Sequence, residues 1–345
     1  MRLLLTHGTA TGRAEGGKLL RAGDVQVWQP WDTPAATRRF YAHFRPDVGV
    51  LMETEVWPNL IGAGRRAGVP IALVNARLSD KSLRGARRAA ALLRPAYAAL
   101  SAAWAQTEAD AERLCQAGAR NVAVLGNLKF DAAPDAAAVA RGQAWRAGHD
   151  AARPVVMLAS SREGEETMLL DAICARPQLA VQWLIVPRHP QRFDAVADLI
   201  HAAGRSVSRR SGWPGDAPPA ADGSTVWLGD SLGEMAAYYT LADVALLGGS
   251  FAPLGGQNLI EAAACGCPVV MGPHTFNFDQ AARQALAAGA ARRASDMADA
   301  VAQAADLLQD PTQHGAMAQA ARAFAVSQRG AAARMAEALA RLIAI

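Results

Sequence analysis

The sequence has few charged residues and no long apolar run. Charged side chains make up 19% of the 345 residues, and the longest uncharged stretch, residues 244–260, is interrupted by four glycines and a proline. A membrane-spanning helix needs about 20 consecutive apolar residues. We therefore expect any contact with a membrane to be peripheral. Hydrophobic residues are nevertheless 51% of the chain, enough to fill two domains of about 150 residues each.

Cysteine is scarce, and the usual metal and cofactor motifs are missing. Of the four cysteines, only Cys265 and Cys267 are close in sequence, and no second pair accompanies them. This pattern is typical of reduced thiols in a cytosolic protein rather than of a zinc site. The sequence also has no P-loop, no Gly-x-Gly-x-x-Gly after its first strand and no Asp-x-Asp motif. We expect no bound metal and no cofactor.

The positive charge is modest. The formal net charge is +4, and arginines gather at residues 84–88 and 205–210. These clusters are either solvated surface or sites of attraction to anionic lipid or phosphate. No nucleic-acid-binding motif interleaves basic and aromatic residues, so a nucleic-acid partner is not expected.

Short β-branched or leucine-rich runs alternate with helical patterns along most of the chain, which predicts βαβ units and parallel sheets. The expected strands are Arg2–Thr6, Val25–Trp28, Val48–Met52, Ile71–Val74, Ala102–Gln106, Val122–Leu125, Val155–Ala159, Gln182–Val186, Thr225–Leu228, Val244–Leu247 and Val269–Met271. Residues 211–224, with three prolines and three glycines, are expected to form a surface loop. The alternation of strands and helices pauses between Lys129 and Pro154. We therefore predict an α/β protein with two doubly wound Rossmann-like domains facing a central cleft, the GT-B architecture. The expected domains are residues 1–150 and 151–345, and the last helix is a candidate to pack back on the first domain.

Hydroxyl groups, glycine and glutamate follow the first strand of the second half. Ser160 and Ser161 come directly after that strand, and three glutamates surround Gly164. The spacing predicts a capping box that opens a helix. The start of such a helix is either a plain cap or a site for a donor phosphate or sugar, because free N–H groups gather there.

Pro187, Arg188, His189 and Pro190 follow the next expected strand, Gln182–Val186. Two prolines hold this strand end rigid, so Arg188 is placed to pair with a phosphate or carboxylate. His189 either does the same or bonds to a backbone carbonyl group. Ligands of open α/β sheets bind beyond the carboxyl ends of the strands, which is where these residues stand.

Two glycine-rich turns follow later strands. In the first, Leu232 and Gly233 could reach a base or phosphate with their backbone groups, and Glu234 is expected in the first turn of a helix. In the second, Gly249 and Ser250 stand near residues 255–256, where glycine permits close backbone approach.

Asn258 is expected to begin the helix that follows the second turn, and Glu261 lies in its first turns. A carboxylate there could accept both ribose hydroxyls of a nucleotide. The alternative is a glycine-rich turn followed by a structural glutamate. Four strand ends of this kind favour a nucleotide-sugar site.

Polar side chains also follow the strands of the first half. Those expected on the acceptor side are Glu53, Glu55, Asn59, Asn75, Arg77 and Lys129. The acidic residues and Asn59 would bind sugar hydroxyls or hold basic groups. Asn75 and Arg77 would suit an anionic sugar or a lipid phosphate, and Lys129 would offset substrate charge. Structural roles remain the alternative for all of them.

Taken together, these segments resemble the Kdo (3-deoxy-D-manno-octulosonic acid) transferases. The matching segments, in the order of that family, are ETEVWPNLI (53–61), NARLS (75–79), GNLKFD (126–131), SSREGEE (160–166), PRHP (187–190), GDSLGE (229–234), GGS (248–250) with GGQNLIE (255–261), and GPHTFNF (272–278). The set covers nearly the whole chain.

The resemblance implies transfer of Kdo from CMP-Kdo to a lipid A precursor (lipid IVA) in lipopolysaccharide synthesis, at the cytoplasmic face of the bacterial inner membrane. It implies contacts between CMP and Pro187, Arg188, Leu232, Gly233, Glu234, Asn258, Leu259, Ile260 and Glu261.

The family's apolar anchor and its His-x-x-Ser-x-Gly-Glu segment, which carries the general base, have no counterpart in this sequence. The sequence therefore assigns no catalytic residue and predicts a chain that begins after the family's first strand, binds CMP and transfers poorly. The alternatives are a truncated or non-catalytic paralogue that binds nucleotide sugars, or another GT-B transferase or epimerase.

Overall fold

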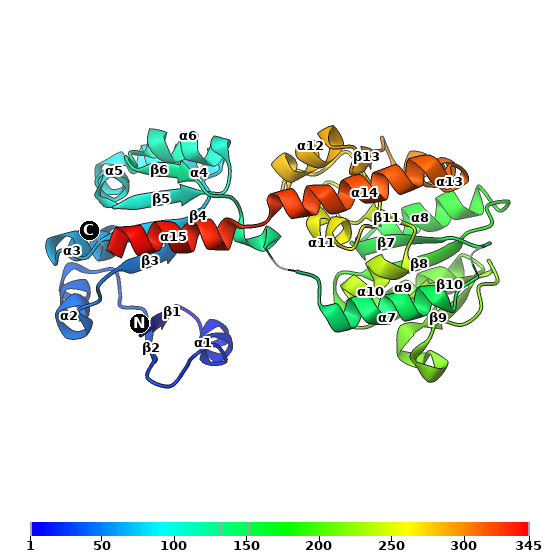
Figure 1. Cartoon of the computed structure of the whole chain (residues 1–345), viewed down its shortest axis with the longest axis horizontal. Coiled ribbons are helices and arrows are strands. Elements are labelled where there is room, and N and C mark those ends of the chain that lie inside the picture. The colour runs from blue at the N-terminus through cyan, green and yellow to red at the C-terminus, as the bar shows by residue number, and fades with distance from the viewer. Residues whose placement is uncertain (1, 132, 151, 344–345) are drawn as a thin grey trace. The chain divides into compact units, whose positions relative to one another are not determined.

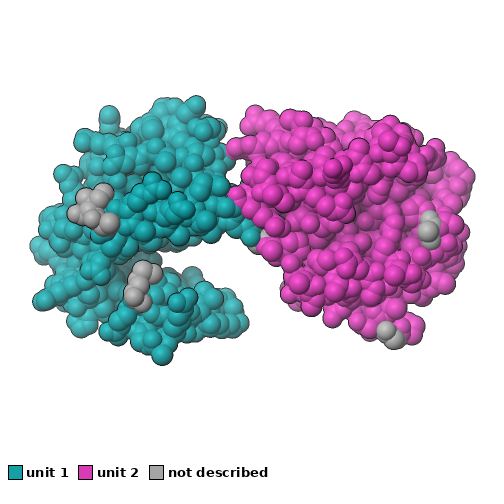
Figure 2. Space-filling view, in the orientation of Figure 1, with its two compact units in different colours: residues 1–131, 330–345 teal, residues 132–329 magenta. Residues whose placement is uncertain are grey.

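The computed structural model describes residues 2–131, 133–150 and 152–343 and divides into two compact units. Unit 1 comprises residues 1–131 and 330–345, and unit 2 comprises residues 132–329 (Figures 1 and 2). The sequence-based boundary at residue 150 lies 19 residues after this division. The difference arises because helix α7 (Ala136–Ala147) packs on α10 (Met235–Leu241) of unit 2. Within the described residues, no helix is long and apolar enough to cross a membrane.

Unit 1 is built on a parallel four-stranded sheet in the order β3-β4-β5-β6. Its strands are β3 (Gly49–Met52), β4 (Ile71–Ala76), β5 (Ala102–Ala105) and β6 (Val122–Val124). Its helices are α1 (Ala10–Gly17), α2 (Pro34–Phe44), α3 (Pro58–Arg66), α4 (Asp80–Arg88), α5 (Ala90–Ala99), α6 (Glu108–Ala117), the short 3-10 helix η1 (Leu128–Phe130) and α15 (Ala331–Ile343).

Strand β4 is buried on both faces, and alternate side chains join different cores. Ile71 and Leu73 pack with the helices of one face, whereas Ala72 and Val74 pack with Met335 of α15 on the other. This alternation follows from the two-residue period of a strand. The chain re-enters unit 1 at Gly330, and the carboxylate of Asp131 accepts hydrogen bonds from the backbone N–H groups of residues 330–332. The point where the chain leaves unit 1 is thereby tied to the point where it returns.

The first two strands form a sheet of their own. Strands β1 (Leu4–His7) and β2 (Val25–Trp28) pair in parallel, and within the described residues neither is hydrogen-bonded to β3 (Figure 1). The prediction of two strands here is confirmed, but they do not extend the main sheet. Trp28 and Trp31 remain exposed in this region.

Unit 2 contains a seven-stranded parallel sheet in the order β13-β12-β11-β7-β8-β10-β9. The strands are β7 (Val155–Ser161), β8 (Gln182–Pro187), β9 (Ser206–Arg209), β10 (Thr225–Leu228), β11 (Val244–Leu247), β12 (Val269–Met271) and β13 (Ala291–Arg293). Its remaining helices are α8 (Glu165–Cys174), η2 (Pro190–Arg192), α9 (Phe193–Ala202), η3 (Arg210–Gly212), η4 (Pro214–Asp216), α11 (Leu259–Ala264), α12 (Asp279–Ala287), α13 (Met297–Gln309) and α14 (Pro311–Gln328).

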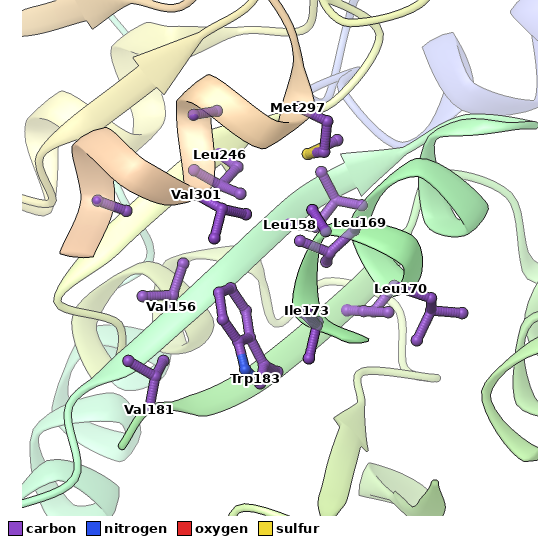
Figure 3. Packing of buried hydrophobic residues seen from close by; sticks show 14 of the residues in the cluster. Val156, Leu158, Leu169, Leu170, Ile173, Val181, Trp183, Leu246, Met297 and Val301 are labelled. Atoms are coloured by element: carbon purple, nitrogen blue, oxygen red, sulfur yellow. The ribbon is translucent and has the colours of Figure 1, made fainter. Parts of the chain in front are cut away.

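The core of unit 2 lies between the sheet and helices α8, α9 and α13. Figure 3 shows part of it, with Trp183 of β8 packed among aliphatic side chains such as Leu158, Ile173 and Val301. These four side chains are at most 3% exposed. Burying an aliphatic side chain of this size contributes about 1.5–3 kcal/mol, so the core holds the strand ends in fixed positions.

Two features of unit 2 depart from the sequence-based prediction. The edge strands β9 and β13 were not expected, because each is short and carries arginine. The predicted surface loop at residues 211–224 contains Trp213, which is 6% exposed and packs against Trp145 and Trp227. The proline and glycine content of this segment predicted an exposed loop and gave no indication that Trp213 is buried.

Candidate active site

The strand order of unit 2 reverses at β7. Strand β8, the next in sequence, pairs with one edge of β7, and the chain later crosses over to pair β11 with the other edge. Open α/β sheets bind ligands outside the carboxyl ends of their strands at such a reversal. The loops after β7 and β11 therefore form the centre of the candidate site.

Glu165 joins these two loops. Its carboxylate is fully buried and accepts hydrogen bonds from the backbone N–H groups of Gly249, at 2.7 Å, Phe251, at 3.0 Å, and Ala252, at 3.2 Å. It also accepts a bond from the N–H of Arg162, at 2.9 Å. No specific role was predicted for Glu165, yet its side chain holds the glycine-rich loop after β11 against the start of α8.

The predicted capping box at residues 160–166 is wrong. Helix α8 begins at Glu165, and its N-cap is Gly164, with a φ of 89° and no side-chain cap. Ser161 is fully buried and donates to Glu166, which also pairs with Arg192. Ser160 lies in the left-handed region, with a φ of 53°. Such backbone strain in a non-glycine residue is typical of functional sites.

Ser250 supports the loops from within. It is fully buried, donates to the carbonyl oxygen of Leu247 and accepts from the N–H of Gly272, at 2.8 Å. The hydroxyl groups of Ser161 and Ser250 are therefore both bonded within the protein, and the prediction that these two residues lie at the donor stays a prediction. Gly249 has a φ of 71° and is buried, and a Cβ at this position would lie 3.2 Å from Nε2 of Gln257.

Arg188 and Glu261 are two charged side chains of opposite sign near the reversal. Arg188 is exposed after β8, and within the described residues neither side chain has a hydrogen-bond or ion-pair partner. Burial raises the pKa of the Glu261 carboxyl, and the positive charge of Arg188 offsets part of this effect. An opposite pair of this kind can face a phosphate and a ribose at once. His189, beside Arg188, is exposed. It is the N-cap residue of η2, but its side chain makes no cap hydrogen bond to that helix.

Asn258 caps α11, as predicted, by accepting a hydrogen bond from the N–H of Ile260, at 3.1 Å. The side chains of Leu259 and Ile260 are buried in the core, at 1% and 3% exposed, so these two residues offer only backbone groups to a ligand. Pro187 is buried at the end of β8 in the same way.

The turn after β10 has an exposed backbone at Leu232 and Gly233 and a carboxylate, that of Glu234, which is bonded to neighbouring side chains. Leu232 is 73% exposed, and Gly233, with a φ of 79°, has open space where a side chain would stand. Glu234 is the N-cap residue of α10, and its carboxylate contacts Arg141, Arg210 and Ser231. Burial alone would raise the pKa of Glu234, but hydrogen bonds from Ser231 and Arg210 and the arginine charges lower it. Glu234 therefore remains ionised and anchors the turn.

Unit 1 gathers a charged group at the carboxyl ends of its strands. The carboxylate of Glu53 lies 3.0 Å from Nε of Arg77 and 3.8 Å from Nζ of Lys129. Glu53 has a φ of 52°, and Arg77 and Lys129 are more than half exposed. Two cations share one carboxylate, so the group carries net positive charge and suits an anion.

The other predicted acceptor residues are bonded within unit 1. Asn75 is 2% exposed, and its Oδ1 accepts from the N–H of Leu128, at 3.1 Å, so it supports the segment that carries Lys129. Asn59 donates to the backbone oxygen of Asp32, at 2.7 Å. Glu55 accepts from the indole of Trp57, at 3.3 Å.

Asp32 was not predicted. Its carboxylate accepts hydrogen bonds from the N–H groups of Asn59 and Leu60 at the start of α3. Asp32 lies in the loop between β2 and α2 and belongs to none of the predicted motifs. In the part of the chain that the structure describes, no cluster of His, Cys, Asp and Glu could hold a metal ion.

Comparison with known proteins identifies the family. A family model described as "3-Deoxy-D-manno-octulosonic-acid transferase (kdotransferase)" matches residues 1–132, and one described as "Glycosyl transferase-like" matches residues 193–340. The 3-deoxy-D-manno-octulosonic acid transferase of Bordetella pertussis is 52% identical over 98% of this chain and 80% of its own length. The transferase of the same name from Haemophilus influenzae is 32% identical over 89% of this chain and 72% of its own length.

Among solved structures, the UDP-GlcNAc 2-epimerase of Neisseria meningitidis has a TM-score of 0.62 and 14% identity, covering 99% of this chain and 91% of its own. At 14% identity the similarity concerns the fold alone, and it confirms a GT-B protein with two Rossmann-like α/β units. The strand order reverses within the sheet of unit 2, whereas strands β3 to β6 of unit 1 lie in sequence order. The prediction of a cleft between the units stays a prediction. The identity to the two transferases favours the predicted family over the epimerase alternative, and the chain belongs to the 3-deoxy-D-manno-octulosonic acid transferase family of glycosyltransferases.

Proposed function

We propose that the chain transfers Kdo from CMP-Kdo to a lipid A precursor, lipid IVA, in lipopolysaccharide synthesis. Unit 2 binds the donor and unit 1 binds the acceptor. The observation that carries the proposal is the opposite pair of Arg188 and Glu261 at the strand reversal of unit 2, in a chain that is 52% identical to a Kdo transferase.

The donor nucleotide fits the available groups of unit 2. Arg188 pairs with the phosphate, because a guanidinium group binds phosphate oxygens with two parallel hydrogen bonds. Glu261 accepts the ribose hydroxyl groups. The backbone at Leu232 and Gly233 is exposed and unobstructed, and it meets the base or the phosphate. The backbones of Pro187, Asn258, Leu259, Ile260 and Glu234 complete the nucleotide site.

The sugar end of the donor lies near the loops after β7 and β11. Ser160, Gly164, His189 and Gly249 are the contacts proposed there, and Ser161 and Ser250 support them from behind. In the reaction, an acceptor hydroxyl group loses its proton to solvent, and its oxygen bonds to the anomeric carbon of Kdo. The bond from that carbon to the CMP phosphate oxygen breaks, and CMP leaves with the electron pair. Arg188 stabilises the charge that develops on the departing phosphate.

The acceptor carries phosphate groups, and unit 1 offers Arg77 and Lys129 beside Glu53. Glu55 and Asn59 stand on the same strand-end segment. Contact with the cytoplasmic face of the inner membrane is peripheral in this proposal, and exposed arginines of α4 supply attraction to anionic lipid.

The proposal is tested with the full chain in two measurements. Calorimetry should show that CMP binds more tightly than UMP or AMP. Incubation with CMP-Kdo and lipid IVA should give a lipid that is heavier by one or more Kdo residues in a mass spectrum. Preference for UMP, or binding of none of the three nucleotides, would overturn the donor assignment. CMP binding without any Kdo-bearing lipid would overturn the transferase assignment for this chain.

A further inference from the structure

Unit 1 has a pocket at the end of its sheet that is opposite the predicted acceptor residues. It has a volume of about 820 Å³. Asp47 lies just before β3, and Val69 and Pro70 lie just before β4, so the pocket opens at the amino ends of these strands. Glu53 and Arg77 follow the carboxyl ends of the same two strands. The pocket is therefore separate from the site proposed for the acceptor.

Three arginines line this pocket. Arg38 and Arg45 come from α2 and its C-cap, and Arg66 ends α3. Asp47 is the single acidic residue of the lining, and within the described residues none of the three guanidinium groups forms an ion pair with a carboxylate. Uncompensated arginines around one hollow create a positive potential that attracts anions.

The side chain of Tyr41 also lines the pocket. Tyr41 is 6% exposed, and among the described residues its hydroxyl has no hydrogen-bond partner. Burial raises the pKa of Tyr41 to about 12, so the hydroxyl is a protonated donor at neutral pH. Because Tyr41 lines the pocket and its hydroxyl has no partner among the described residues, this hydroxyl is available to donate to a bound acceptor.

One wall of the pocket is apolar. Leu342 and Ile343, at the end of α15, line it together with Val69 and Pro70. Ile343 is 43% exposed. Guanidinium groups, a hydroxyl donor and an apolar wall suit a molecule that carries a phosphate group beside an apolar part, and they do not suit a cation or a neutral sugar.

We propose that this pocket binds a phosphate group, presented either by a phospholipid headgroup or by a dissolved phosphate ester. Arg38 and Arg66 pair with the phosphate oxygens, and the Tyr41 hydroxyl donates to one of them. The proposal does not depend on the transferase assignment, because the pocket lies at the other end of the sheet.

The test compares two double variants of the full chain. R38A/R66A removes two lining arginines, whereas R39A/R65A removes two exposed arginines from the same helices that do not line the pocket. Each loses the same charge, so non-specific attraction weakens equally in both. The probes are glycerol 3-phosphate, followed by calorimetry, and vesicles of phosphatidylglycerol in phosphatidylcholine, followed by co-sedimentation.

R38A/R66A should bind whichever of the two probes wild type binds about tenfold more weakly than wild type does. The affinity of R39A/R65A for the same probe should stay close to that of wild type. Binding of glycerol 3-phosphate identifies a dissolved ester as a sufficient ligand, and binding to the vesicles alone identifies a lipid headgroup. Tyr41→Phe should also weaken binding while leaving the unfolding midpoint unchanged. Equal losses in the two double variants, or no binding of either probe by wild type, would overturn the proposal.

Discussion

Glu165 and Gly249 are 84 residues apart in sequence and are joined by a hydrogen bond of 2.7 Å from the Gly249 N–H to the buried carboxylate. This contact links the loop after β7 to the loop after β11 at the point where the strand order reverses. The same carboxylate accepts two more N–H groups from the second loop. Glu165 is therefore a positioning residue for the proposed donor site, and its side chain is fully buried.

Replacing Glu165 by glutamine should destabilise the protein. The amide has one acceptor oxygen where the carboxylate has two, and its NH2 group would face backbone donors, so we expect a loss of about 3 kcal/mol in the free energy of unfolding. CMP affinity should fall as well, because the loop after β11 loses its anchor. Urea unfolding and calorimetry measure the two effects. Glu163→Gln, at an exposed neighbouring position, is the control and should match wild type in both.

The role of Glu165 shows where sequence-based prediction stops. All eleven predicted strands are present, because runs such as residues 155–159 and 244–247 combine β propensity with burial on both faces. The positions of Arg188 after β8, of Lys129 after β6 and of Glu261 in the helix after β11 could be predicted from those strands. The partners of a buried carboxylate do not follow, because nothing local in the sequence relates Glu165 to Gly249.

The same limit explains the other departures. The distant cap of α3 by Asp32 and the buried packing of Trp213 depend on contacts between segments far apart in the chain. The predicted cap by a serine before α8 failed because glycine in the left-handed region turns the chain there instead. Residue type and spacing predict where polar groups gather, whereas tertiary contacts decide which of them remain free for a ligand.

Arg188→Ala should weaken CMP binding far more than cytidine binding. The guanidinium group is proposed to meet only the phosphate, so CMP should bind about tenfold more weakly while cytidine, which has no phosphate, is unaffected. Calorimetry with both ligands measures this difference. An equal loss for the two ligands would place Arg188 against the nucleoside and contradict the proposed orientation of the donor.

Asn75 offers a test of backbone strain at the acceptor side. It has a φ of 50° and accepts the N–H of Leu128. Asn75→Ala loses the acceptor and adds the cost of a left-handed alanine, whereas Asn75→Gly loses only the acceptor. We expect the alanine variant to be less stable than the glycine variant by about 1 kcal/mol in thermal or urea unfolding. Asn75→Asp keeps the acceptor and should lie closest to wild type.

Glu261 should make stability and CMP binding depend on pH in opposite directions. Burial raises the pKa of its carboxyl above the ordinary value, so the folded protein holds this proton more tightly than the unfolded chain. Its contribution to stability is therefore present at low pH and is lost as the pH rises through the folded pKa. CMP binding needs the ionised carboxylate to accept the ribose hydroxyls, so affinity should rise over the same pH range.

Glu261→Gln removes the titrating group and should flatten both trends. Because the phosphate of CMP itself titrates near pH 6, the informative quantity is the difference in affinity between wild type and Glu261→Gln at each pH. At neutral pH the variant should bind CMP about tenfold more weakly. A ligand without the 2′-hydroxyl, 2′-deoxy-CMP, should bind wild type more weakly than CMP does and should show a smaller difference with the variant. If wild type and Glu261→Gln prefer CMP over 2′-deoxy-CMP by the same factor, Glu261 does not contact the ribose 2′-hydroxyl.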